Sequence, residues 1–325
     1  MKIMILGLGV IGTTYGYIFQ KAGFETEHFV REERRHNVPE IIKIKLLDGR
    51  NKKTQQVEDI YKVKNAEPNS EYDFILVSIS SNKLEAAIRT LNDNNISGTI
   101  LLFNGVWQNK SQIENIMGCR KYILGYPVAG GKMDLKNGIL DCVIFDRFML
   151  EREAKTNVEN YNNILKVFEK SAIKAEYPYD MLEWIWIHMA LNAGVISTAA
   201  KYGNINDPTG AARTLMESTK ALKETILSIR EAMNIIKTRG VKLKNYRNEL
   251  LSYYMPSNIA AILMKKMFKT NELSRKIMEL HSNKNDLFYV CSNVYNTGKQ
   301  NNVSSVNLYN NYEMYISHLL TNIDA

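Results

Sequence analysis

The first half of the chain alternates short apolar runs with longer segments in which apolar residues recur at helical spacing. The segment 13–22 is one of these helical stretches, and Gly23 is placed to end it. Runs that are apolar almost throughout are typical of strands buried on both faces of a parallel sheet. Strands that alternate with helices in this way predict a doubly wound α/β sheet. The predicted strands lie at residues 2–6, 25–30, 74–79, 99–103 and 121–126.

Residues 41–63 fit neither pattern cleanly. They mix β-branched residues with Lys and Gln, and Asp48 and Gly49 form a turn signal. This segment predicts either a hairpin or an irregular excursion from the sheet.

After about residue 178 the pattern becomes helical. Long periodic stretches predict an all-helical second half. We therefore expect two domains, residues 1–178 with the sheet and residues 179–325 with the helices. The expected helices span residues 180–200, 211–238, 256–267, 271–296 and 307–323.

The chain is basic, with 42 Lys and Arg against 34 Asp and Glu and a formal net charge of +8. These basic residues are scattered and do not alternate with aromatic residues as in a nucleic-acid groove. A solvated surface explains the charge better than nucleic-acid binding does, so no nucleic-acid partner is expected.

The cysteines, the histidines and the N-terminal stretch limit the cellular compartment and the kinds of site that we expect. The three cysteines have no CxxC spacing and are expected to be thiols in a reducing compartment, and the five histidines predict no metal site. The apolar N-terminal stretch is too short and too rich in glycine for a membrane span, and no cleavage site follows it. We expect a cytoplasmic protein with no membrane partner.

A glycine motif directly follows the first predicted strand and opens the first predicted helix. There the first glycine permits a tight turn, the second lets backbone N–H groups approach a pyrophosphate, and the third lets helix and strand pack closely. A ligand-free glycine turn is the common alternative, but the strand–helix–strand order favours a Rossmann-type dinucleotide-binding domain. The expected cofactor contacts come from Gly7, Gly9, Val10, Ile11 and Gly12.

The end of the second predicted strand distinguishes the two nicotinamide cofactors. An NAD site places Asp or Glu there to bind the ribose 2′-hydroxyl, whereas this chain has Arg31, with Arg34 and Arg35 behind it. A guanidinium binds a 2′-phosphate through two hydrogen bonds, so the sequence favours NADPH. The alternatives are a charged loop in which Glu32 and Glu33 pair with the arginines, or a ribose contact by Glu32.

Together these features resemble the ketopantoate reductase (2-dehydropantoate 2-reductase) family. Asn104 and Gly105 are similar to the family's Asn-Gly after the fifth strand, where the asparagine lies near nicotinamide and substrate. Residues 125–128 match its next strand and turn, and residues 186–192 match its Trp-x-Lys-x-x-x-Asn helix start. The resemblance is strong up to about Asn206. It implies an NADP-dependent oxidoreductase of pantothenate biosynthesis that forms a homodimer through its helical domain.

Some positions depart from the family. His188 stands where the family has its general-acid lysine, and Ser80 stands where a second lysine follows the fourth strand. The family's C-terminal glutamate would fall near residues 278–283, where Glu279 and Ser282 are the candidates. The substrate is therefore open between ketopantoate and another 2-oxo acid.

Reduction of a small 2-oxo acid sets the chemistry that the site must perform. Negative charge builds on the carbonyl oxygen, so a positioned acid must supply a proton, and imidazolium is able to do so. His188 and Asn192 lie one helical turn apart and can face one cleft. We expect His188 to donate the proton, Asn192 to hold the substrate, and Asn104 to orient nicotinamide and substrate. Ser80 is expected to contact the cofactor.

Two alternatives stay open. His188 lies in an apolar run with Trp184 and Trp186, so a core histidine bound to a backbone group is as well supported as a proton donor. At the level of function, the missing lysine permits a non-catalytic NADP(H)-binding protein that keeps the fold. Other two-domain oxidoreductases would need their own signatures in the helical half, and these are not found.

Overall fold

The computed structural model describes residues 1–32, 38–204, 206–280 and 283–321. The chain divides into two compact units, which we name unit 1 (Met1–Leu182) and unit 2 (Glu183–Ala325). The division falls close to residue 178, where the sequence pattern changes. Each unit has its own hydrophobic core.

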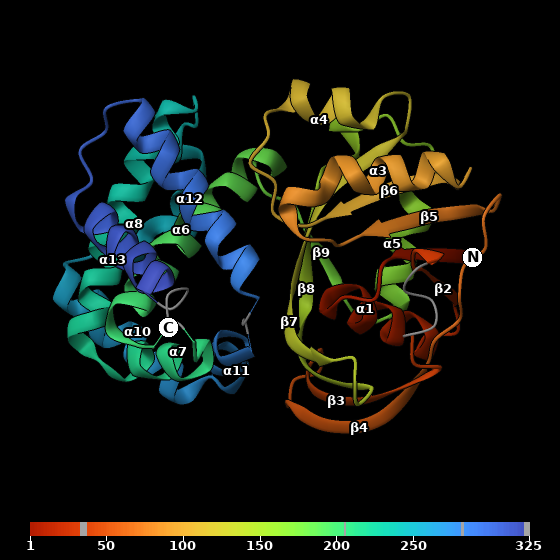
Figure 1. The fold of residues 1–325 in the computed structure, drawn as a ribbon, viewed down its shortest axis with the longest axis horizontal. Coiled ribbons are helices and arrows are strands. Elements are labelled where there is room, and N and C mark those ends of the chain that lie inside the picture. Colours follow the sequence, from red (N-terminus) through yellow and green to blue (C-terminus); the bar gives the residue numbers. More distant parts are fainter. Residues whose placement is uncertain (33–37, 205, 281–282, 322–325) are drawn as a thin grey trace. The chain divides into compact units, whose positions relative to one another are not determined.

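In the described part of unit 1, nine strands form one mixed sheet (Figure 1). They are β1 (Lys2–Leu6), β2 (Glu25–Phe29), β3 (Ile41–Gly49), β4 (Gln55–Lys62), β5 (Glu71–Val77), β6 (Ser97–Phe103), β7 (Tyr122–Asp134), β8 (Ile139–Leu150) and β9 (Lys174–Glu176). The order along the sheet is β2-β1-β5-β6-β7-β8-β3-β4, and β9 pairs with β8.

The predicted Rossmann-type sheet is confirmed for the first five positions of this order. Neighbouring strands from β2 to β7 are parallel to one another. The sheet then continues beyond the predicted strands, because β8 runs antiparallel to β7 and the hairpin of β3 and β4 adds at the far edge. Of the two predictions for residues 41–63, the hairpin is therefore confirmed.

Four α-helices accompany this sheet in the described residues. They are α1 (Val10–Lys21), α3 (Leu84–Asp93), α4 (Lys110–Met117) and α5 (Tyr161–Lys170). Aromatic residues of α1 and α5 meet those of the sheet in the core. Phe148 of β8 stacks on Phe168 of α5 with ring centroids 3.8 Å apart, and Tyr15 of α1 meets the edge of Phe103 of β6 at 5.0 Å.

The sheet curls around α1, so that its two edges meet. The backbone N–H of His28 at the end of β2 donates to the carbonyl of Lys64 at 2.7 Å, and the N–H of Ala66 donates to the carbonyl of His28 at 2.9 Å. The chain that leaves β4 at one edge thus pairs with β2 at the other. Every residue of α1 from Gly12 to Phe19 is consequently buried.

Unit 2 is helical, as predicted, in its described residues. Its helices are α6 (Met181–Tyr202, which begins at the end of unit 1), α7 (Pro208–Glu217), α8 (Thr219–Thr238), α9 (Arg247–Tyr254), α10 (Ser257–Thr270), α11 (Glu272–Leu280), α12 (Lys284–Gln300) and α13 (Val306–Thr321). No helix in the described ranges is long and apolar enough to cross a membrane.

Two of the predicted helices are in fact pairs of helices. The stretch 211–238 breaks at Ser218, whose extended backbone and side-chain oxygen cap α8 by accepting the N–H of Ala221. The stretch 271–296 divides into α11 and α12, and Asn283 caps α12 by accepting the N–H of Asn285. Polar capping residues inside an apolar periodic pattern are the physical reason for both corrections.

Helices α6 and α8 form the centre of unit 2. They pack closely at Gly194, because a Cβ built there would lie 2.8 Å from Ile229 Cγ1. Asn311 of α13 is fully buried and donates its amide to the hydroxyls of Thr198 on α6 and Ser228 on α8, both at 3.1 Å. This buried polar link holds three helices in register.

Candidate functional site

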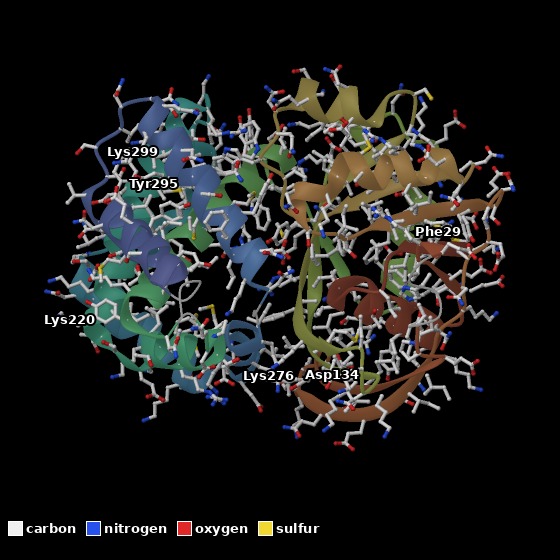
Figure 2. The ribbon with its side chains drawn as sticks, viewed as in Figure 1. Phe29, Asp134, Lys220, Lys276, Tyr295 and Lys299 are labelled. Carbon is white, nitrogen blue, oxygen red and sulfur yellow. The ribbon has the colours of Figure 1, made fainter. Side chains whose placement is uncertain are left out.

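The glycine motif of unit 1 forms a turn that requires glycine at its first position. Gly7 has φ +86°, a conformation that residues with a Cβ adopt rarely. Its N–H donates to the carbonyl of Phe29, the last residue of β2, at 2.9 Å. Phe29 is labelled in Figure 2. The turn is thereby fixed between the ends of β1 and β2, at the edge of the sheet where parallel strands end.

Gly9 is the N-cap of α1, and no described residue of unit 1 requires it to be glycine. Its backbone is extended, and a Cβ built there would approach only the carbonyl oxygen of Ser78, at 3.9 Å. The first turn of α1 has no acidic residue, and Gly9 has no side chain to cap it. Free N–H groups at the positive end of a helix, left open by a glycine, suit an anion such as a pyrophosphate.

Val10 and Ile11 begin α1 and turn their side chains inward. Both are partly buried and pack against the core of unit 1. Their available groups for a ligand are therefore the backbone N–H groups of the first helical turn.

Gly12 permits the close packing of α1 on the sheet. A Cβ built at this position would lie 2.6 Å from Ile5 Cγ2 and 3.0 Å from Ser78 Oγ. The third glycine of the motif therefore serves the fold, while the second leaves space over the helix N-terminus.

His28 holds the glycine turn in place through a hydrogen bond to Gly7. Its Nδ1 lies 2.7 Å from the carbonyl oxygen of Gly7, and its Nε2 lies 2.9 Å from the hydroxyl of Tyr61 on β4. A carbonyl can only accept, so Nδ1 carries the proton and Nε2 accepts from Tyr61. Thr26 lies 3.3 Å from the same hydroxyl and donates to it. Burial lowers the pKa of His28 to about 4, so the ring is neutral.

Buried polar atoms without partners lie at the same edge of the sheet. Asn104 follows β6 and is buried, and its Nδ2 donates to the carbonyl of Ile79 at 3.2 Å. Its Oδ1 has no partner among the described residues, and neither does Ser78 Oγ. Buried polar atoms in folded proteins are normally hydrogen-bonded. Both residues follow strands at the sheet edge where α1 also begins, and a nicotinamide dinucleotide bound along this edge would supply partners for these oxygens.

Arg31 and Ser80 lie on loops beside this site. Arg31 is exposed and comes two residues after the end of β2, followed by Glu32, which is also exposed. Ser80 comes three residues after the end of β5 and is half-buried. Glu33, Arg34 and Arg35 lie outside the described residues, so the expected arginine cluster is represented here by Arg31 alone.

The candidate groups of unit 2 lie on helix α6. His188 is half-buried, and its ring stacks on that of Trp184, one turn earlier, with centroids 4.9 Å apart and planes 9° apart. Asn192 is half-buried one turn later on the same face and lines a cavity. The structure therefore brings His188 and Asn192 onto one helical face.

This cavity, which we name the α6 cavity, has a volume of about 80 Å³, is partly open, and is lined by residues of unit 2. Its α6 wall is made of side chains that recur every three or four residues. They are Asn192, Val195, Ile196, Ala199 and Ala200. The opposite walls are Pro208, Ala211 and Ala212 of α7, Met278 of α11, Lys284 and Leu287 of α12, and Tyr315 of α13.

Of the two candidates for the family's C-terminal glutamate, only Glu279 lies in the described residues. Its carboxylate pairs with Arg213 of α7 through two contacts of 3.1 and 3.2 Å. Its backbone carbonyl accepts from the hydroxyl of Thr209 at 2.8 Å. Glu279 thus joins α11 to α7 as an ion pair, while Ser282 lies outside the described residues.

Sequence reasoning overlooked several residues of these sites. Ser78 and His28 lie in ordinary strand patterns, and only the three-dimensional contacts connect them with Gly12 and Gly7. The α6 cavity could not be predicted from the sequence either, because its wall residues follow the same apolar periodicity as core residues. The one available hint was that Asn192 begins a stripe of residues at helical spacing.

The family model described as ketopantoate reductase PanE/ApbA matches residues 3–138. No curated protein matches the chain. A dimeric ketopantoate reductase from Staphylococcus aureus is similar in fold, with TM-score 0.65 and 14% identity over 99% of both chains. A D-mandelate dehydrogenase in ternary complex with NADH and anilino(oxo)acetate has a TM-score of 0.67 and 15% sequence identity over 98% of both chains. A 2-dehydropantoate 2-reductase from Geobacter metallireducens has a TM-score of 0.64 and 13% sequence identity over 98% of this chain and 99% of that one.

Proposed function

We propose, on the premise that residues 3–138 form a ketopantoate reductase PanE/ApbA domain, that the protein is an NADPH-dependent reductase of a small 2-oxo acid. The observation that best supports this function is that the open N-terminus of α1 and the buried Oδ1 of Asn104, which has no partner among the described residues, lie at the same edge of the sheet. A helix N-terminus binds a pyrophosphate, and a buried amide oxygen accepts a hydrogen bond from a carboxamide.

Unit 1 holds the cofactor in this proposal. The N–H groups of Gly9, Val10 and Ile11 bind the pyrophosphate, and Arg31 binds the 2′-phosphate. Asn104 orients the nicotinamide with its Oδ1, since its Nδ2 is already held by the carbonyl of Ile79. Ser80 contributes a hydroxyl from the loop after β5. NADPH supplies a hydride when it is bound.

Unit 2 carries the acid and the substrate contacts. As a hydride reaches the carbonyl carbon of a 2-oxo acid, the carbonyl oxygen gains negative charge that a proton must neutralise. His188 donates this proton from its imidazolium form, with its ring orientation fixed by the stack on Trp184. Asn192 binds the substrate one helical turn away.

The substrate is taken from the family and from the similar folds. Ketopantoate is the first candidate, and with it the protein would act in pantothenate biosynthesis. A D-mandelate dehydrogenase of the same fold adds aromatic 2-oxo acids to the candidates. Because His188 stands in place of the family's lysine, both ketopantoate and aromatic 2-oxo acids are tested as substrates.

The protein is also proposed to form a homodimer, as the Staphylococcus aureus enzyme does. Helix α10 exposes Ile259, Ile262, Leu263 and Met267, which are between 39 and 59% exposed and lie on one helical face. Monomeric proteins rarely expose large continuous apolar patches. A second copy of the chain, docked face to face by two-fold symmetry, would bury this one.

The experiment follows NADPH oxidation with a panel of 2-oxo acids, comparing wild type with His188→Ala and His188→Lys. Removing the acid should lower kcat roughly 10²–10⁴-fold without changing NADPH affinity. Lysine should restore activity and move the alkaline limb of the pH profile upward, because its ordinary pKa exceeds that of histidine. NADH should be a poorer donor, and Arg31→Ala should remove the preference while Arg89→Ala, exposed on α3, should not.

Specific results would contradict the proposal. NADPH binding without turnover of any panel member would favour the non-catalytic NADP(H)-binding protein. Normal turnover by His188→Ala together with a lower melting temperature would identify His188 as a core residue.

A further inference from the structure

The α6 cavity combines a polar end with apolar walls. Asn192, Val195, Ile196, Ala199 and Ala200 are spaced so that they form one stripe along α6. His188 lies four residues before Asn192 and continues the stripe at its N-terminal end. The stripe therefore runs from the proposed proton donor, past the proposed substrate contact, to hydrocarbon side chains.

This order fixes the direction of a bound substrate. Two helical turns separate His188 from Ile196, which is roughly 12 Å along the axis at 1.5 Å per residue. A 2-oxo acid with its carbonyl at His188 and Asn192 would extend its side chain along α6 toward Ile196 and Ala199. No position of that stripe beyond Asn192 offers a hydrogen-bond partner from its side chain.

The opposite walls are equally apolar apart from two groups. Lys284 lines the cavity, and its Nζ donates to Asn206 Oδ1 at 2.9 Å. Tyr315 is the second polar lining residue, and burial raises the pKa of its hydroxyl, which is therefore neutral. The polar lining residues of the cavity are thus Asn192, Lys284 and Tyr315, and its other nine lining residues are hydrocarbon or, in Met278, a thioether.

The volume limits what the apolar part can hold. The α6 cavity measures about 80 Å³, whereas an engineered cavity of about 150 Å³ holds a benzene ring. A branched side chain of a few carbon atoms fits this space better than an aromatic ring does.

We propose that the α6 cavity is a specificity pocket, and that the substrate is a 2-oxo acid whose side chain is a small branched hydrocarbon without a hydroxyl group. The inference rests on the proposed reductase function and adds a substrate class to it. A hydroxyl placed against the α6 stripe beyond Asn192 would face only hydrocarbon side chains, and a benzene ring is larger than the volume of about 80 Å³.

The test compares four substrates with NADPH and the full chain. They are pyruvate, 3,3-dimethyl-2-oxobutanoate, ketopantoate and phenylglyoxylate. Ketopantoate is the 4-hydroxy derivative of the second compound, so the pair differs by one hydroxyl. The dimethyl compound should have a kcat/KM roughly tenfold or more above that of ketopantoate, and should also exceed phenylglyoxylate.

The outcomes distinguish a failure of the pocket proposal from a failure of the proposed reductase function. If ketopantoate or phenylglyoxylate equals or exceeds the dimethyl compound, the pocket proposal is overturned while the reductase function stands. If none of the four is reduced by a chain that binds NADPH, the reductase function fails and takes the pocket with it.

Variants test the position of the pocket. Ala199→Leu fills the cavity and should lower the kcat/KM ratio of the dimethyl compound to pyruvate at least about tenfold. Ile196→Ala enlarges it and should raise the ratio of phenylglyoxylate to the dimethyl compound. Thr214→Leu, on an exposed position of α7, is the matched control and should change neither ratio. Unchanged ratios in folded Ala199→Leu and Ile196→Ala, as judged by circular dichroism, would overturn the proposal.

Discussion

His28 shows how one side chain makes the stability of unit 1 depend on pH. Its ring is buried and neutral, with Gly7 on one side and Tyr61 on the other. Burial lowers the pKa of His28 to about 4, whereas a histidine in the unfolded chain titrates near pH 6.5. Protonation therefore favours the unfolded state. The contribution of His28 is complete above about pH 6.5 and is lost as the pH falls toward 4.

His28→Gln should reduce the pH dependence of unfolding, because glutamine is able to donate to Gly7 and does not titrate. Between pH 7.5 and pH 5, wild type should lose about 2 kcal/mol more unfolding free energy than the variant. Urea titrations at both pH values measure this. The comparison with the variant removes the effects of other titrating groups. An equal loss in both proteins would mean that His28 is protonated without penalty in the folded state.

The residues of the candidate site differed in how visible they were in the sequence. Gly7, Gly9 and Gly12 could be predicted because each glycine has a separate physical reason at a fixed spacing. Ser78 and His28 could not, since a serine or histidine in a strand carries no signal until its neighbours are known. His188 and Asn192 depended on the family resemblance, because apolar periodicity alone favours a core position.

At the scale of elements, helix α1 assigns different tasks to its glycines. Gly9 leaves open space at the helix N-terminus, whereas Gly12 allows α1 to lie against Ile5 of β1. A substitution at Gly9 should therefore affect ligand binding, and one at Gly12 should affect the fold.

Gly9→Val should abolish NADPH binding and lower the unfolding free energy by no more than about 1 kcal/mol, because valine is a poorer N-cap residue than glycine. Gly12→Val is the matched variant and should lower the unfolding free energy by about 1–3 kcal/mol through overpacking. Titration calorimetry with NADPH and urea unfolding distinguish the two effects. Unchanged NADPH affinity in Gly9→Val would refute the placement of the pyrophosphate.

Most elements could be predicted from periodicity, and the failures have identifiable causes. The parallel strands β1, β5 and β6 contain continuous apolar runs, which is why their positions were predicted well. Strand β8 was not predicted, since polar residues such as Asp141 and Asp146 interrupt its apolar pattern. The break at Ser218 between α7 and α8 was missed because apolar periodicity continues across it.

At the scale of the whole molecule, the apolar face of α10 predicts self-association. Ile262→Asp places a charge in the middle of this face and should convert the dimer into a monomer, because an unpaired buried charge is strongly unfavourable. Ile60→Asp, at a similarly exposed isoleucine on β4, is the control. Sedimentation velocity measures both. A wild-type monomer, or a dimer that survives Ile262→Asp, would contradict this interface.

The closure of the sheet around α1 also has a consequence for synthesis on the ribosome. Lys43 of β3 pairs with Ile139 of β8, a contact between residues about 100 positions apart. At 5–20 residues per second, the hairpin of β3 and β4 waits roughly 5–20 s for its partner strand. Until then the Tyr61 hydroxyl lacks its final support, and so does His28 beneath the glycine turn. We therefore expect the turn proposed to bind the nucleotide, although it is among the first segments to be made, to be fixed only after β8 has joined the sheet.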